Sequence, residues 1–310
     1  MQRLLITGAG GQLGRELTAE AARRGTAVVA LTRAGCDITD SSAVAEVLDE
    51  HRPEALINCA AWTDVDGAET HEEAAFAVNE GGAGVLAAAC AQRSVLLVHV
   101  STDYVFGGAP HRPLDEEAAP SPLSVYGRSK LAGEVTVRAR TPLHQIVRTS
   151  GLYGMDGPNF VLKVLQRAAT GMDLSVVSDQ VTAPTWTGHL AGALLRLAAL
   201  RVPGTFHLTN TGSTSWHGFA TAAVAAAGYD TRVRPVTSAR RTMAARRPRY
   251  TVLDNRAWRR LSQAPLPHWR VALESYLAEL RARDALPLAP GTTPCLIEPR
   301  APAPPSRVRR

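Results

Sequence analysis

The segment RLLITGAGGQLG, residues 3–14, decides the fold. It begins with a strand-length apolar run, Leu4–Ile6, and continues with Gly8, Gly11 and Gly14 at the spacing G-x-x-G-x-x-G. A helical pattern opens at once after the glycines. Glycine permits a tight turn there and lets backbone N–H groups and a helix N-terminus approach a pyrophosphate. The segment predicts a dinucleotide-binding loop; the alternative is an ordinary strand-to-helix turn, which also favours glycine.

The pattern around this loop extends over about 150 residues. Short apolar runs lie at 4–6, 27–31, 55–57, 95–100 and 145–147, and helical patterns cover about 13–21, 44–48 behind the N-cap Asp40, and 72–92. Strands that alternate with helices predict β-α-β units around a parallel sheet. Right-handed crossovers then give an α/β fold with a doubly wound sheet of the Rossmann type, with helices on both faces.

The periodicity is less regular after residue 150. Helices are expected at about 159–170, 187–200 and 215–227, strands at 174–177, 205–208 and 231–236, and a last amphipathic helix runs from Trp269 to Leu280. We predict a cofactor-binding domain of residues 1–150 plus about 174–208. A smaller C-terminal α/β substrate domain should comprise about 151–173 plus 209–283. Residues 284–310, rich in proline and arginine, are expected to form a disordered tail.

Composition limits the class of protein. The 310 residues are 45% hydrophobic and 20% charged, with a net charge of +6, of which Arg300, Arg307, Arg309 and Arg310 against Glu298 place +3 near the C-terminus. The remaining chain is only mildly basic, which argues against a nucleic-acid partner. We expect no export signal and no membrane span. The four cysteines lack disulfide or metal-ligand spacing, so we expect a cytoplasmic protein without a tightly bound metal.

Three residues near the second strand bear on the choice of cofactor. Arg33 stands where NAD enzymes often place an acid on the ribose hydroxyls. A guanidinium there can pair with a 2′-phosphate, so NADPH is favoured and NADH is left open. The alternative is a solvated loop arginine. Asp37 and Ile38 could flank an adenine edge.

A second constellation carries chemistry. Tyr126 and Lys130 are spaced i, i+4, which places both on one face of a helix. We expect Lys130 to lower the pKa of the Tyr126 phenol, which could then protonate an alkoxide as hydride arrives. Thr102 and Asp103 follow a buried strand, where open α/β sheets bind ligands. Alone, the pair could mark an ordinary surface helix, and the two polar residues could merely cap the next segment.

Together these segments resemble the extended short-chain dehydrogenases, and within them the dTDP-4-dehydrorhamnose reductases. The similarity rests on GAGGQLG, NCAAWTDVDGAE from residue 58, STDYVF from 101, PLSVYGRSKLAGE from 122, RTSGLYG from 148, DQVTAPT from 179 and RRPRYTVLDN from 246. The resemblance implies that Thr102, Tyr126 and Lys130 carry the reduction. It also implies that Thr102 and Asp103 touch the sugar and that the cofactor is lined by Gly11, Gln12, Leu13, Asp37, Ile38, Ala61, Trp62 and Thr63.

The chain departs from the family pattern in several places. Gly151 stands where the family usually has tryptophan beside the sugar, which suggests more space and a modified substrate. Thr182 replaces a usual glycine. Some relatives hold magnesium at a dimer contact through a set of acidic residues. Only Glu16 of that set is recognisable here, which supports the expectation of no tight metal. A homodimer is left open. Arg247 is our choice for a contact to the nucleotide diphosphate; a solvated basic face is the alternative.

The function implied by the resemblance is reduction, by NADPH, of the 4-keto group of a dTDP-4-dehydro-6-deoxy-L-hexose. The product would be dTDP-L-rhamnose or a deoxysugar for a secondary metabolite. Two alternatives remain: a non-catalytic, NADP-binding regulatory subunit of the same fold, and a sugar-nucleotide epimerase or dehydratase. The joint presence of Thr102, Tyr126 and Lys130 disfavours the first. Tyr104 stands where dehydratases need an acid, which disfavours the second.

Overall fold

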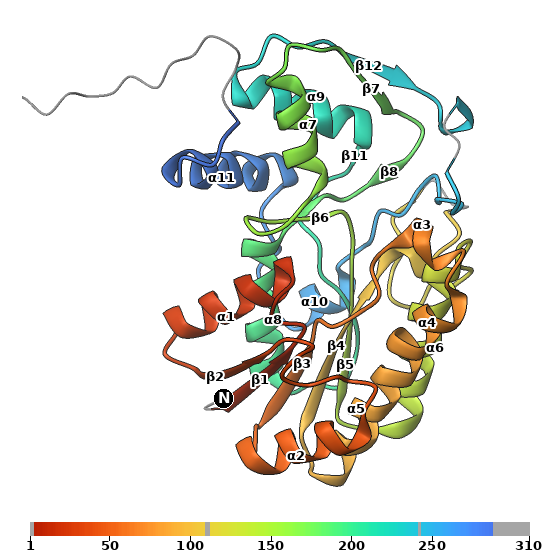
Figure 1. Cartoon of the computed structure of the whole chain (residues 1–310), viewed down its shortest axis with the longest axis vertical. Helices are drawn as coiled ribbons and strands as arrows, with labels where there is room; N and C mark the ends of the chain where they lie inside the picture. Colours follow the sequence, from red (N-terminus) through yellow and green to blue (C-terminus); the bar gives the residue numbers. More distant parts are fainter. Residues whose placement is uncertain (1–2, 109–111, 241–242, 288–310) are drawn as a thin grey trace, which may run out of the picture.

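The computed structural model describes residues 3–108, 112–240 and 243–287. A six-stranded parallel sheet in the order β10-β5-β4-β3-β1-β2 forms its centre (Figure 1). The strands are β1 (Arg3–Thr7), β2 (Ala27–Leu31), β3 (Ala55–Asn58), β4 (Leu96–Thr102), β5 (His144–Thr149) and β10 (Gly204–His207). From β1 the chain goes to β2 on one side and then to β3 on the other, so the switch point lies between β1 and β3. The predicted doubly wound α/β fold is confirmed.

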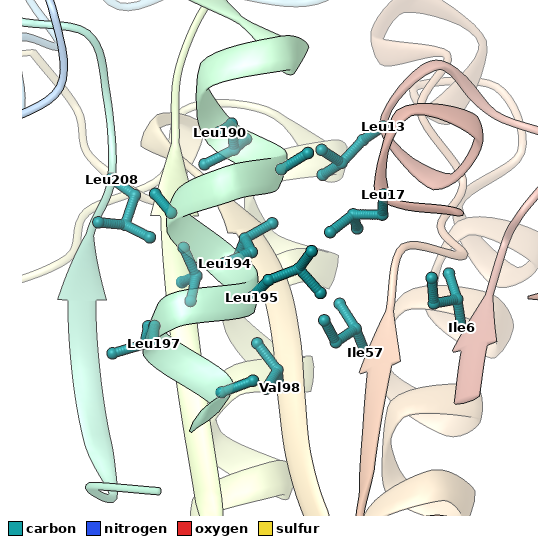
Figure 2. Close-up of a cluster of buried hydrophobic side chains, with 14 of the residues drawn as sticks. Ile6, Leu13, Leu17, Ile57, Val98, Leu190, Leu194, Leu195, Leu197 and Leu208 are labelled. Carbon is teal, nitrogen blue, oxygen red and sulfur yellow. The ribbon is translucent and has the colours of Figure 1, made fainter. Parts of the chain in front are cut away.

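Helices cover both faces of the sheet. On one face lie α1 (Gln12–Arg23), α8 (Thr187–Leu200) and the short α10 (Arg256–Arg260). On the other lie α2 (Ser41–His51), α5 (Ala83–Gln92) and α6 (Val125–Arg140). Figure 2 shows leucines of α1 and α8 packed together over Ile6, Ile57 and Val98 of the sheet. Each such buried side chain contributes about 1.5–3 kcal/mol, so this three-layer core fixes the strand ends that carry the site.

The helical stretch expected over 72–92 is interrupted. It consists of α4 (Glu72–Phe76), a π-helical segment η1 (Ala77–Gly82) and α5, and it follows the short α3 (Val65–Ala68). By length and composition, Glu72–Gln92 could cross a membrane, but half of its apolar window is buried inside the fold. It packs against α6 and the sheet, as a core helix does.

The smaller domain lies over the carboxyl ends of the strands (Figure 1). It holds three two-stranded pairs, β6 (Leu152–Tyr153) with β9 (Thr185–Trp186), β7 (Leu174–Val177) with β12 (Val233–Val236), and β8 (Val181–Thr182) with β11 (Thr214–Ser215). Its helices are α7 (Phe160–Ala168), α9 (Trp216–Ala227) and α11 (Trp269–Ala282). They enclose an aromatic core around Tyr153, Phe219, Trp269 and Tyr276.

Two of the expected domain boundaries need correction. β7, β8 and β9 were assigned to the cofactor-binding domain, but they pair with β12, β11 and β6 of the smaller domain. The buried side chains of β7, Leu174 and Val176, pack on α7 and α9. In the opposite direction, α10 returns to the large sheet, where Trp258 is fully buried in the main core. Most of the expected tail, from residue 288, lies outside the described residues.

Candidate active site

A cavity of about 650 Å3 opens at the carboxyl ends of the sheet strands, between the two domains. It brings together most of the residues singled out from the sequence: Gly8, Gly11, Gln12, Leu13, Gly14, Ala61, Thr63, Thr102, Asp103, Tyr126, Lys130 and Gly151. Arg33, Asp37, Ile38, Trp62 and Arg247 are not among its lining residues. The site therefore combines the predicted phosphate loop with the predicted Thr/Tyr/Lys constellation.

The phosphate loop is shaped by close backbone packing. Gly8 has a φ of +69°, and a Cβ there would lie 2.5 Å from the backbone nitrogen of Ala60, so only glycine fits between β1 and the chain after β3. α1 begins at Gln12. Its N-cap residue, Gly11, makes no side-chain capping hydrogen bond, and the first turn of the helix has no acidic residue. Its N-terminal N–H groups and positive dipole end are left for an anion. These features fit the pyrophosphate of NADP(H), whereas Gln12 Oε1, buried without a hydrogen-bond partner, can only accept and is not a phosphate contact.

The segment after β3 is held by the π-helix. Asn79 Oδ1 accepts from the Trp62 backbone N–H at 2.9 Å, and its Nδ2 donates to the Trp62 carbonyl at 3.2 Å and to Ser129 Oγ at 2.9 Å. The Trp62 indole donates to the Asp64 carbonyl at 3.0 Å. Trp62 thus anchors the segment, while its neighbours Ala61 and Thr63 line the cavity.

The three residues beyond β2 lie apart from the cavity. Arg33 Nε is 3.3 Å from Asp37 Oδ2, and the Arg33 side chain is 84% exposed. Hydrogen bonds from Thr39 hold the pKa of Asp37 below its ordinary value. Ile38 is buried in the second core cluster. An exposed ion pair of this kind is weak, so Arg33 is free to reorient toward a phosphate.

The catalytic constellation spans β4 and α6. Ser124 Oγ caps α6 by accepting from the Gly127 N–H at 3.1 Å, which fixes the first helical turn next to Tyr126. Tyr126 shares a hydrogen bond with Thr102, the last residue of β4. The Lys130 Nζ donates to the Val100 carbonyl at 2.7 Å. A hydroxyl pair and an ammonium are therefore gathered at one wall of the cavity.

The predicted net lowering of the Tyr126 pKa is wrong for this geometry. Burial raises the pKa of Tyr126 to about 12, the hydrogen bond with Thr102 opposes this increase, and Asp103 adds to it. Burial lowers the pKa of Lys130 to about 8. At neutral pH Tyr126 is consequently a phenol, the form that can give a proton to a reduced carbonyl oxygen.

Asp103 is an almost fully buried carboxyl group. Burial raises its pKa to about 6, although hydrogen bonds from Thr251, Thr102 and Ser150 oppose the increase. Thr102 Oγ1 donates to Asp103 Oδ1 at 3.1 Å. The Ser150 hydroxyl is hydrogen-bonded to that of Thr182. A carboxyl group among hydroxyls, facing a cavity, suits a polyhydroxylated ligand.

The side of the cavity farther from the phosphate loop contains residues that sequence reasoning did not assign to it, among them Gln180, Thr251 and Trp216. Trp216 packs on Phe160 and also lines the cavity. Gly151 has a φ of +56°, and a Cβ there would lie 3.2 Å from Pro184 Cα. A backbone with this φ strains any side chain, so glycine suits this position of the loop.

Arg247 is engaged elsewhere. Its Nη2 lies 2.7 Å from Asp66 Oδ2 and its side chain is 15% exposed, and it also hydrogen-bonds Tyr104. Its contact to a diphosphate stays a prediction. Within the described ranges, no group of three or more His, Cys, Asp or Glu side chains could hold a metal ion. Glu16 pairs with Arg23 at 3.0 Å.

The fold and the site together define an NAD(P)-dependent dehydrogenase of the extended short-chain type. The family model described as RmlD substrate binding domain matches residues 1–282, and the chain belongs to this family. The resemblance inferred from the sequence is confirmed.

Named relatives support the same family. A dTDP-4-dehydrorhamnose reductase of Streptomyces griseus is 46% identical over 92% of this chain and 96% of its own. A dTDP-4-keto-6-deoxy-D-glucose reductase of Streptomyces niveus is 45% identical over 91% of this chain and 99% of its own. A crystal structure of dTDP-4-dehydrorhamnose reductase from Bacillus anthracis in complex with NADP superposes with a TM-score of 0.88, at 37% identity over 90% of this chain and all of that one.

Proposed function

We propose that this chain is an NADPH-dependent reductase of the 4-keto group of a dTDP-4-dehydro-6-deoxyhexose. The observation that carries the proposal is the half-buried phenol of Tyr126, hydrogen-bonded to Thr102 in the cavity that the phosphate loop also lines. The two Streptomyces relatives are named as reductases of such sugars, and the Bacillus relative binds NADP. We infer the L-hexose as substrate from the first of these names.

Each residue has a distinct role in the proposed reaction. NADPH, when bound, supplies the hydride. The Thr102 and Tyr126 hydroxyls orient the keto oxygen, and Tyr126 gives it a proton as it becomes an alkoxide. The Lys130 ammonium stabilises the phenolate that remains. The Asp103 carboxyl group accepts from sugar hydroxyls, and the loop from Gly8 to Gly14 holds the pyrophosphate. The predictions of a cytoplasmic location and a homodimer stay predictions.

The test is NADPH oxidation at 340 nm with enzymatically prepared dTDP-4-keto-6-deoxy-L-hexose, repeated with Tyr126→Phe. Loss of a general acid costs about 10²–10⁴-fold in turnover. Tyr104→Phe is the matched control, because Tyr104 lines the same cavity and its ring packs edge-on against that of Tyr126, with 5.8 Å between the ring centroids. We expect Tyr126→Phe to abolish turnover with NADPH binding retained and Tyr104→Phe to keep most of it. No turnover by the wild type, despite tight NADPH binding, would contradict the proposal.

A further inference from the structure

A line of buried hydrogen bonds runs beneath the cavity from β1 to α6. Thr7 Oγ1 donates to Asn58 Oδ1 at 2.8 Å, and the backbone N–H of Ala60 donates to the same oxygen at 3.0 Å. Asn58 Nδ2 lies 3.1 Å from His99 Nδ1, and His99 Nε2 lies 3.4 Å from Lys130 Nζ. Asn58, His99 and Lys130 are each at most 2% exposed. Neighbouring strands β1, β3 and β4 thus connect to the lysine of the site.

The donors and acceptors along this line of hydrogen bonds are fixed at the Asn58 end. A backbone N–H can only donate, so the amide atom of Asn58 that faces Ala60 is the oxygen, and the NH₂ group faces His99. The Nδ1 atom of His99 must then accept, which places the hydrogen of the neutral ring on Nε2. That N–H faces Lys130 Nζ. An ammonium group has no lone pair with which to accept it, whereas a neutral amine has one.

Resting on the proposed reductase function, we propose that His99 is a positioning residue that makes Lys130 release its proton more readily than an ordinary lysine. Its Nε2–H, held in place by Asn58, forms a hydrogen bond only with the neutral amine. Lys130 and Tyr126 line the same cavity, and in this proposal the released proton returns there to the Tyr126 phenolate and restores the phenol after each hydride transfer. The amine that remains accepts the His99 Nε2–H until solvent protonates it again.

The charged and titratable groups around Lys130 do not account for an easier release of its proton. Glu134, one turn further along α6, favours the charged lysine, but its carboxylate is already bound by Arg148, whose Nη2 lies 2.7 Å away. Burial raises the pKa of the Cys59 thiol to about 12, so this neighbour is neutral at neutral pH. Burial and the nearby Lys130 hold the pKa of His99 well below its ordinary range, so the ring itself stays neutral.

The chain offers a direct measurement, because its only lysines are Lys130 and Lys163. Lys163 is exposed on α7 and serves as an internal reference. In the full-length protein labelled with ¹³C-lysine, the Lys130 Cε resonance should titrate near pH 8. Ring ¹⁵N shifts should show His99 protonated at Nε2. Both readouts are independent of turnover, so they test this inference even if no sugar substrate is reduced.

Two variants should reverse the direction of the hydrogen bond between His99 and Lys130. In Asn58→Asp, a carboxylate accepts from His99 Nδ1–H, so Nε2 becomes an acceptor for the ammonium; in His99→Gln, the amide oxygen can accept from it. In both, the Lys130 titration and the alkaline limb of kcat should move up by about one pH unit, as expected for one gained hydrogen bond to a charged group. His207→Gln, at another buried histidine, is the matched control and should leave both unchanged.

Three results would overturn the inference. They are a wild-type His99 protonated at Nδ1, a Lys130 titration that does not move in Asn58→Asp although the tautomer has changed, and an equal movement in His207→Gln. If one variant fails to fold, the wild-type tautomer and the other variant still decide. Absence of turnover in the wild type with the expected tautomer and titration would contradict the reductase proposal instead.

Discussion

Glu134→Gln should destabilise the protein strongly, because it breaks a buried ion pair beneath the catalytic helix. The Glu134 carboxylate is fully buried and accepts from Arg148 Nε at 2.9 Å, Arg148 Nη2 at 2.7 Å and Ser101 Oγ at 2.6 Å. Arg138 Nη2 adds a contact at 2.8 Å. Glutamine keeps the shape but removes the charge, and the Arg148 side chain, 2% exposed, is left as an unpaired buried cation.

The magnitude follows from this burial. Loss of one partner of a buried pair costs about 3–5 kcal/mol, and the Arg138 contribution is smaller because that side chain is 36% exposed. At about 2–4 °C per kcal/mol for a protein of this size, Tm should fall by about 6–20 °C. Burial alone would raise the pKa of Glu134, but its bonds to Arg148 and Ser101 hold it below the ordinary value. The stabilisation is therefore present above about pH 4 and is lost as the pH falls further.

The assay is urea unfolding at pH 7.5 and at a pH below 4, with thermal melts alongside. Asp173→Asn is the matched control, because it breaks the exposed pair with Arg234 and should change stability by less than about 1 kcal/mol. The double variant Glu134→Gln/Arg148→Met should recover part of the loss by removing the stranded charge. A single-variant loss below about 1 kcal/mol, or no recovery in the double variant, would refute the reasoning.

Two further predictions concern ligand binding. Arg33→Ala should weaken NADPH binding about tenfold, as expected for one lost bond to a charged group, and leave NADH binding nearly unchanged in a fluorescence titration; equal losses would exclude the 2′-phosphate contact. Asp103→Asn should lower kcat/KM for the sugar yet raise stability above pH 6. The difference between 3.8 and about 6 in the pKa of Asp103 corresponds to at most about 3 kcal/mol, which denaturation should detect at pH 7.5 and lose below pH 4.

The cofactor half of the site was predictable because it is local in sequence. A strand, a glycine turn and a helix follow one another at Gly8–Gly14, and the i, i+4 spacing of Tyr126 and Lys130 holds wherever α6 packs. The substrate half was not, since Gln180 and Thr251 reach the cavity from short strand pairs and loops without periodicity. Arg247 shows the same limit, because nothing near it in sequence indicates its partner Asp66.

The ionisation of the catalytic pair shows why spacing alone misled. The helical spacing joins Tyr126 to Lys130 and suggests a lowered phenol pKa, but burial acts on both groups and opposes the charged form of each. The outcome, a phenol with a pKa of about 12 beside a lysine at about 8, favours one direction of reaction. A phenol can protonate an alkoxide at neutral pH, whereas oxidation of an alcohol requires the phenolate as base. Because Lys130, with a pKa of about 8, supplies the proton that restores the phenol, turnover in the reductive direction should fall as the pH rises through 8.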